Sequence, residues 1–312
     1  MDNISQWLTD PIGAYRAWQM RDATGADRRP FSARSVTQHA AMFERFLRHV
    51  VAHRESVATF GADHLESFFA AVENRCAPGT TTQLRYAKLI DRLCRHRVEI
   101  GLRKSNPAAD FARHTAWPED EPVPLFLEPD ADDRLQQYVQ PAATDLQRET
   151  RNRAIVALLA GTGITAAEIR SATNQDLIID RVRPHVVVPK RGARDERKVS
   201  LPPFAVPALE LWSSTHAAQG DEALLFPSPR SAKPMNDMLL GSVVREALEA
   251  IEFRAPDLSP RALRNTYARR QLLAGRSNED VCRLLGLASQ RTVIRLRATM
   301  SESVHALAAE PT

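Results

Sequence analysis

The chain has 312 residues, of which 43% are hydrophobic and 26% are charged, and its formal net charge is +4. This is the composition of an ordinary globular protein, and the length accommodates two domains that each bury a core. Because there is no apolar run of about 18 residues and no charged-then-apolar segment at the start, we expect a soluble cytoplasmic protein without a membrane partner. The three cysteines are odd in number and lack CxxC spacing, which argues against a disulfide framework or a zinc site, so we expect no metal and no cofactor.

The basic charge is concentrated in the first third of the chain. Through Pro118 there are 17 Lys and Arg against 12 Asp and Glu, whereas the remainder is close to neutral. A positive excess of this size permits a polyanionic partner without requiring one.

The first third is predicted to be a series of helices. Apolar residues recur at helical spacing over 4–20, 36–51 and 62–72, and Ser35 is a plausible N-cap for the second helix. The Pro-Gly break within 77–79 ends this series and precedes a fourth helix.

The fourth expected helix, with N-cap candidates over 80–82, carries the strongest functional signal of this region. A third of its circumference holds Arg85, Lys88, Arg92, Arg95 and His96, opposite an apolar face. Such a basic stripe suits a helix laid along DNA phosphates, with the Thr residues and Gln83 near its start able to reach base edges. A solvated charged face explains the same pattern equally well.

Residues 117–128, WPEDEPVPLFLE, combine proline and acid without a helical period, which predicts an extended linker. We therefore expect a helical domain over 1–116 and a second domain over 129–312.

The second domain is predicted to contain mostly helices and one β-hairpin. The expected helices span 129–139, 147–160, 207–216, 236–251, 260–274 and 278–285, and the expected strands span 185–190 and 197–201. Thr165 and Glu168 have the spacing of a capping box, so Thr165 should begin a helix.

The stretch from Ser259 to Leu296 resembles the C-terminal signature of the tyrosine recombinases, the phage-integrase family, which usually reads H-x-L-R-H-T-F-A, then L, G, LGH, T and Y. The residues that agree with this frame are Leu263, Arg264, Thr266, Tyr267, Ala268, Leu272, Gly275, Leu284, Leu285, Gly286 and Thr292. The resemblance extends over about 35–296. It implies a mostly α fold with a small antiparallel sheet: a helical SAM-like core-binding domain followed by an α+β recombinase-type domain.

The positions that carry the family's chemistry are largely substituted. The residues at those positions are Thr165 for the first phosphate-binding arginine, Arg261 and Asn265 for two histidines, Leu287 for a third ring and Leu296 for the nucleophilic tyrosine. The resemblance makes Lys190 the candidate for the catalytic lysine and matches Arg264 to the second arginine. Arg261 cannot transfer a proton near neutral pH, but it still attracts phosphate.

The resemblance therefore implies sequence-specific binding of double-stranded DNA without strand cleavage, in an accessory or regulatory role in recombination or integration of a mobile element. The expected DNA-binding residues are Thr82, Arg85, Lys88, Arg92, Arg95, Lys190, Arg261 and Arg264. Besides DNA, the expected partner is an active tyrosine recombinase, or a second copy of this chain joined through the C-terminal tail, 301–312.

Two alternatives remain open. One is an active recombinase with a non-standard nucleophile, either supplied in trans or provided by Tyr267, although the register of Tyr267 with Leu263 favours a core position. The other is a helical interaction scaffold that no longer binds DNA.

Overall fold

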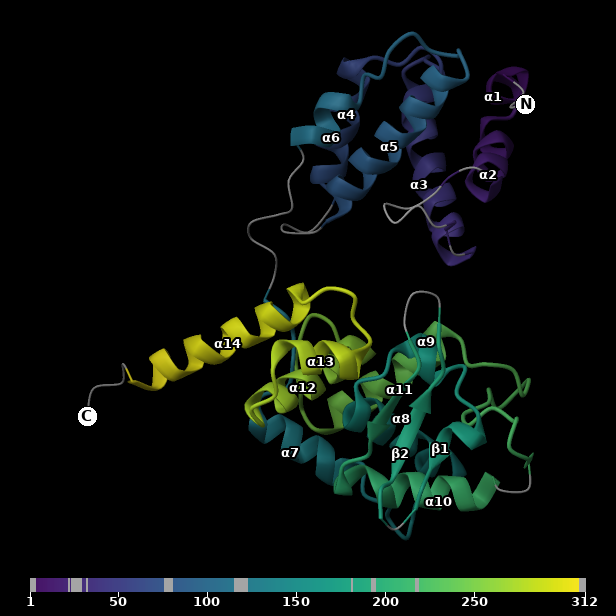
Figure 1. The fold of residues 1–312 in the computed structure, drawn as a ribbon. Coiled ribbons are helices and arrows are strands. Elements are labelled where there is room, and N and C mark those ends of the chain that lie inside the picture. Colours follow the sequence, from purple (N-terminus) through teal and green to yellow (C-terminus); the bar gives the residue numbers. More distant parts are fainter. Residues whose placement is uncertain are drawn as a thin grey trace. The chain divides into compact units, whose positions relative to one another are not determined.

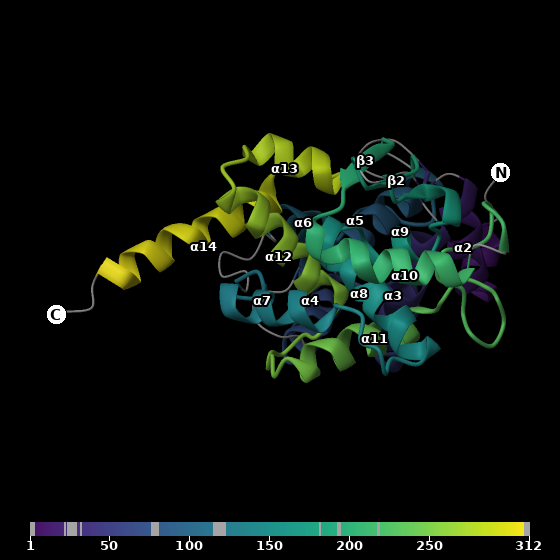
Figure 2. The same ribbon diagram turned by 90° about the horizontal axis from the view of Figure 1, so that it is seen from below.

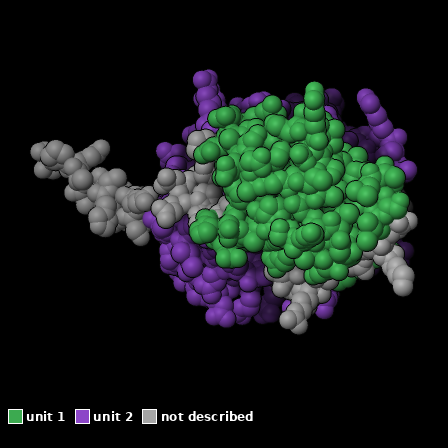
Figure 3. Space-filling model, turned by 90° about the horizontal axis from the view of Figure 1, so that it is seen from above, with its two compact units in different colours: residues 1–122 green, residues 123–312 purple. Residues whose placement is uncertain are grey.

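The computed structural model describes residues 4–21, 23, 30–31, 33–75, 81–114, 123–180, 182–191, 195–216 and 219–308, without the side chains of Arg34, His216 and 301–308. The chain forms two compact units, Met1–Pro122 and Val123–Thr312, which are coloured separately in Figure 3. Residues 115–122 of the expected boundary region lie outside the described residues.

The described part of unit 1 is entirely helical (Figure 1). Its helices are α1 (Ile4–Thr9), α2 (Pro11–Arg21), α3 (Ala33–Ala52), α4 (Ala62–Glu73), α5 (Thr82–Glu99) and α6 (Ala109–His114). The single helix expected over 4–20 is two helices, because Pro11 begins a new one and the Asp10 carboxylate accepts a hydrogen bond from the Gly13 amide at 3.0 Å. The expectation of Ser35 as an N-cap was also wrong, since α3 already begins at Ala33.

The core of unit 1 is rich in aromatic side chains. The Tyr15 ring stacks on Phe43 with centroids 4.3 Å apart, and Phe46 meets Phe60 edge to face at 5.1 Å. Arg97 is 0% exposed, with its guanidinium 3.4 Å from a Trp7 ring centroid, and burial lowers the pKa of Arg97 to about 9.

Unit 2 combines helices with one small sheet. Its helices are α7 (Pro129–Tyr138), α8 (Gln147–Thr162), α9 (Ala166–Ile169), α10 (Val206–His216), α11 (Asp237–Ala250), α12 (Pro260–Leu273), α13 (Asn278–Leu285) and α14 (Arg291–Ala308). The strands β1 (Leu177–Ile178), β2 (His185–Val188) and β3 (Arg197–Ser200) form an antiparallel sheet in that order. The expected hairpin is confirmed with Val186 opposite Val199, and β1 is an edge strand that the sequence analysis missed because it has only two residues.

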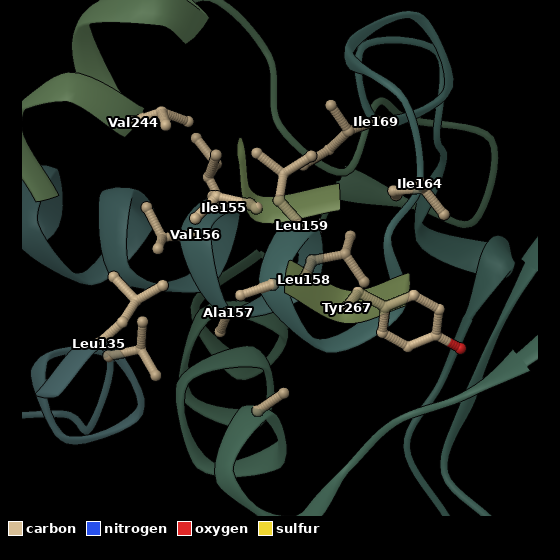
Figure 4. Close-up of a cluster of buried hydrophobic side chains, with 14 of the residues drawn as sticks. Leu135, Ile155, Val156, Ala157, Leu158, Leu159, Ile164, Ile169, Val244 and Tyr267 are labelled. Carbon is tan, nitrogen blue, oxygen red and sulfur yellow. The ribbon is translucent and has the colours of Figure 1, made fainter. Parts of the chain in front are cut away.

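Helix α8 is the centre of unit 2, and α10, α11 and α12 pack around it. Ile155, Leu158 and Leu159 are each 0% exposed, and Figure 4 shows these side chains converging with Val244 of α11 and Tyr267 of α12. The predicted fold class is confirmed: the protein is mostly helical, with a small antiparallel sheet.

The first residues of unit 2 attach to α12. Leu127 is 2% exposed, and its amide donates to Thr266 Oγ1 at 2.8 Å. The side-chain amide of Asn265 donates to the Leu125 carbonyl, also at 2.8 Å. The end of the segment expected to be a linker is thus bonded to the core of unit 2.

The last helix, α14, begins on α12 and α13, and its C-terminal half extends away from the other helices of unit 2 in both ribbon views (Figures 1 and 2). Within the part of the chain that the structure describes, no helix is both long and apolar enough to span a membrane.

Candidate functional site

The arginine that best matches the resemblance, Arg264, lies one turn into α12. Ser259 Oγ accepts a hydrogen bond from the Arg261 amide at 3.3 Å, and Pro260 occupies the first turn, so the start of α12 is set by its own sequence. Arg264 is half-buried, and its guanidinium donates to the carbonyls of Gly163 and Leu285, the latter at 2.7 Å. Arg264 therefore links α12 to the ends of α8 and α13.

The loop that follows α8 turns sharply at Gly163, which has φ +62°. A Cβ at this position would lie 2.5 Å from Cδ1 of Tyr267, so both the backbone conformation and the space require glycine. Thr165 then caps α9, because its Oγ1 accepts from the Glu168 amide at 3.3 Å while the Thr165 amide donates to Glu168 Oε2 at 2.7 Å. The predicted capping box is confirmed, and it gives Thr165 a structural role.

Glu168 also forms a buried ion pair with Arg197 of β3, which the sequence analysis did not identify. Two nearly parallel hydrogen bonds of 3.0 and 2.9 Å join the side chains, and the Arg197 Nε donates to the Leu284 carbonyl at 2.8 Å. Burial opposes ionisation of Glu168, but the hydrogen bonds from Arg197 and Thr165 outweigh it and lower the pKa of Glu168 to about 2. The pair connects α9, β3 and the end of α13.

The position expected for the nucleophile lies inside the core. Leu296 is 0% exposed in the cluster around α8 and α12, and the half-buried Leu287 packs against the same cluster. Tyr267 is 4% exposed, and burial raises the pKa of its phenol. In Figure 4 its ring borders the aliphatic side chains with the hydroxyl directed away from them. The predicted core position of Tyr267 is confirmed.

Arg261 and Lys190 are the accessible cations among the matched positions. Arg261 is exposed on the first turn of α12. Lys190 follows β2 with its side chain 71% exposed, and its Nζ lies 3.8 Å from Asp195 Oδ1. An exposed pair at this distance is weak, so the Lys190 ammonium can exchange Asp195 for another anion. Residues 192–194, between the two expected strands, lie outside the described residues.

In unit 1, α5 exposes part of the expected basic stripe. Arg85 and Lys88 are exposed, and Arg92 is half-buried with its guanidinium 4.8 Å from the Phe31 ring centroid. Arg95 is 68% exposed and forms a hydrogen-bonded ion pair with the buried Asp91.

Two further residues complete the description of α5. The Thr82 side chain is half-buried at the helix start. The inclusion of His96 in the stripe was wrong, because His96 is 7% exposed and stacks on Trp18 with centroids 4.6 Å apart.

The described residues contain no group of three or more His, Cys, Asp or Glu side chains arranged to hold a metal ion. At the matched positions the chemistry is that of cations: exposed Arg261 and Lys190, and Arg264 bonded to backbone carbonyls. Such groups can bind phosphate oxygens.

Comparison with known proteins identifies the family. Residues 127–300 match the model of the phage integrase family, and the chain belongs to that family. The tyrosine recombinase XerC of Bifidobacterium longum (strain DJO10A) is 32% identical over 159 residues, which cover 46% of this chain and 42% of that protein. The chain thus aligns with less than half the length of this relative.

Solved structures share the fold over nearly the whole chain. The XerH site-specific recombinase bound to palindromic difH substrate, in a post-cleavage complex, has a TM-score of 0.79 and 13% identity, covering 99% of this chain and 97% of that one. The Tn1549 transposon integrase in complex with transposon right end DNA has a TM-score of 0.65 and 14% identity, with 94% and 99% covered. A lambda integrase dimer bound to a COC' core site has a TM-score of 0.64 and 14% identity, with 94% of each chain covered. At these identities the likeness establishes the fold.

Proposed function

We propose that this protein binds specific sites on double-stranded DNA without cleaving them and acts in the cytoplasm as an accessory or regulator of recombination or integration of a mobile element. The observation that carries the proposal is Leu296. At the position matched to the family's nucleophilic tyrosine, this side chain is aliphatic and 0% exposed. Without a nucleophile the covalent route to strand exchange is closed.

The other substitutions act in the same direction. Loss of one charge-stabilising donor typically costs about 10² to 10³ in rate, and here Thr165 replaces an arginine and Arg261 replaces a histidine. Thr165 is occupied in the capping box with Glu168, so it serves the fold. Several such losses together leave little catalytic power.

Binding of DNA does not require a nucleophile or a proton donor. Phosphate contacts from Arg85, Lys88, Lys190 and Arg261 need charge and exposure but no proton transfer, and all four side chains are exposed. The relatives with this fold include recombinases and integrases whose structures were solved with their DNA. DNA binding is therefore the part of the family's activity for which this chain has the required residues.

The test is a band shift on DNA fragments that flank the protein's own gene, with each sample divided between a native gel and an SDS gel. We expect a shift that resists random-sequence competitor on the native gel and disappears in SDS. A band that survives SDS would show a covalent protein–DNA link and would refute the loss of cleavage. Failure to prefer any fragment over random DNA would refute the specific-binding part.

The same gels test Tyr267 as an alternative nucleophile. Its ring is 4% exposed and its phenol pKa is raised, both of which oppose attack on phosphate. We therefore expect Tyr267→Phe to leave both gels unchanged, whereas an SDS-resistant band that disappears only in this variant would establish Tyr267 as the nucleophile.

A further inference from the structure

A hollow of about 610 Å³ lies between α3 and α4 of unit 1. Arg45, Arg48 and His49 of α3 line one side, and Arg75 lies just beyond the end of α4. Its apolar lining includes Phe68, which is 2% exposed. None of the residues lining the hollow is acidic, and none belongs to α5, so it is separate from the basic stripe.

Among the described residues, no carboxylate or carbonyl receives a hydrogen bond or ion pair from the three arginines of this hollow, Arg45, Arg48 and Arg75. Some other arginines of unit 1 do have such partners: Arg16 pairs with Glu44 at 2.8 Å, and Arg103 donates to backbone carbonyls. Three guanidinium groups around one hollow repel one another unless an anion lies between them.

We propose that the α3–α4 hollow is a binding site for phosphate groups. Guanidinium donors match phosphate oxygens in pairs, and three of them can surround a multiply charged phosphate. Phe68 and Val72 exclude water from one side of the hollow, which strengthens these interactions. His49 also lines the hollow, and its Nε2 lies 3.3 Å from Ser67 Oγ, which positions the ring.

Two sources could supply the phosphate. One is the backbone of a nucleic acid, which would give unit 1 a second contact besides α5. The other is a free polyphosphate such as a nucleoside triphosphate, and the volume of the hollow suits a ligand of that size. The site itself does not depend on the proposed DNA-binding function.

The test compares two variants of the full chain that remove equal charge. The site variant is Arg45→Gln, Arg48→Gln and Arg75→Gln, and the control replaces three arginines outside the hollow, Arg113, Arg230 and Arg254, by Gln. Calorimetry measures binding of inorganic tripolyphosphate, and salt titrations measure the slope of log affinity against log salt for duplex DNA. A second site variant, Arg48→Gln with Arg75→Gln, changes only exposed side chains. It distinguishes loss of binding from a folding defect caused by replacing the half-buried Arg45.

We expect tripolyphosphate binding to fall at least about tenfold in both site variants and not in the control. If nucleic acid is the source, the DNA slope also becomes shallower by about 0.9 for each phosphate that the variant no longer neutralises. If only tripolyphosphate binding falls, the source is a free polyphosphate. Equal tripolyphosphate binding by wild type, site variants and control would overturn the proposal. A chain that binds tripolyphosphate at the hollow but shifts no DNA would instead count against the proposed function alone.

Discussion

At the scale of single residues, Glu168 and Arg197 connect the elements that surround Arg264. Their side chains are 5% and 9% exposed, and they link the capping box of α9 to β3 and to the Leu284 carbonyl. The neighbouring Gly286, at φ +62°, leaves room for Arg197, because a Cβ there would lie 2.9 Å from its Nη1. The two residues thus hold together the elements around Arg264.

We predict that Glu168→Gln lowers the free energy of unfolding at pH 7 by about 3 to 5 kcal/mol, since Arg197 is left buried without a counter-charge. The folded-state pKa of Glu168 is about 2, below the ordinary value of 4.5, so its stabilisation is full above pH 4.5 and is lost as pH falls through 2. Urea unfolding across this pH range should therefore show that the free energy of unfolding falls less steeply with decreasing pH in the variant than in the wild type. Glu210→Gln, at an exposed position on α10, should change neither quantity.

Leu296 provides a second prediction at this scale. Installing the family's nucleophile by Leu296→Tyr places a larger ring in a position that is 0% exposed, and overpacking of this kind costs about 1 to 3 kcal/mol. We expect a lower melting temperature and no SDS-resistant DNA complex, because Thr165 and Leu287 remain at the other matched positions. Appearance of a covalent complex would mean that the site lacks only its nucleophile.

At the scale of elements, α5 divides its basic residues between two roles. Arg85 is exposed, whereas Arg95 pairs with Asp91 and Arg92 lies over Phe31. A paired or ring-bound guanidinium gains less from a phosphate, because it must give up or share an existing partner. Arg92 and Arg95 should therefore each contribute less DNA affinity than Arg85.

We predict that Arg85→Gln with Lys88→Gln makes the slope of log affinity against log salt shallower by up to about 2, since each neutralised phosphate contributes about 0.9. Fluorescence anisotropy on a duplex at several salt concentrations measures this slope. Arg54→Gln with Arg113→Gln removes the same charge from exposed positions off α5 and should leave the slope nearly unchanged. Identical slopes for the two double variants would favour the solvated-face interpretation of α5.

At the scale of the whole molecule, the two units have separate cores. Unit 2 begins with a non-helical segment, residues 123–128, that precedes α7. Leu127 is 2% exposed, and its amide bonds Thr266, while the Leu125 carbonyl bonds Asn265. Asn265 occupies a position where the resemblance places a histidine. In this protein its side-chain amide holds residues 123–128 against α12.

We predict that a fragment of residues 123–312 unfolds with a free energy about 3.5 to 5 kcal/mol larger than a fragment of residues 129–312. Burial of Leu127 contributes about 1.5 to 3 kcal/mol, and each of the two hydrogen bonds contributes about 1 kcal/mol. Urea unfolding of the two fragments measures the difference. Equal stabilities would mean that residues 123–128 act only as a linker, as their composition suggests.

Much of the fold follows from local sequence. The apolar period of α4, the apolar run of α8, the caps Ser259 and Ser277 and the β2–β3 hairpin are local signals, and each element forms within a few residues of its expected bounds. The sequence also predicts which residues occupy the family's catalytic positions, since the glycines and leucines of the motif set the register. These features depend on neighbours within one or two turns, which composition and spacing report directly.

Only the tertiary structure decided which partners the charged side chains have. The pairing of Glu168 with Arg197, 29 positions away, and the bonds from Arg264 to Gly163 and Leu285 join segments that are remote in sequence. Burial likewise removed His96 from the basic stripe of α5, because two tryptophan rings from α1 and α2 enclose it. Whether a charged side chain contacts solvent, a carbonyl or an aromatic ring depends on which elements, distant in sequence, pack beside it. Helical spacing within one segment does not predict those neighbours.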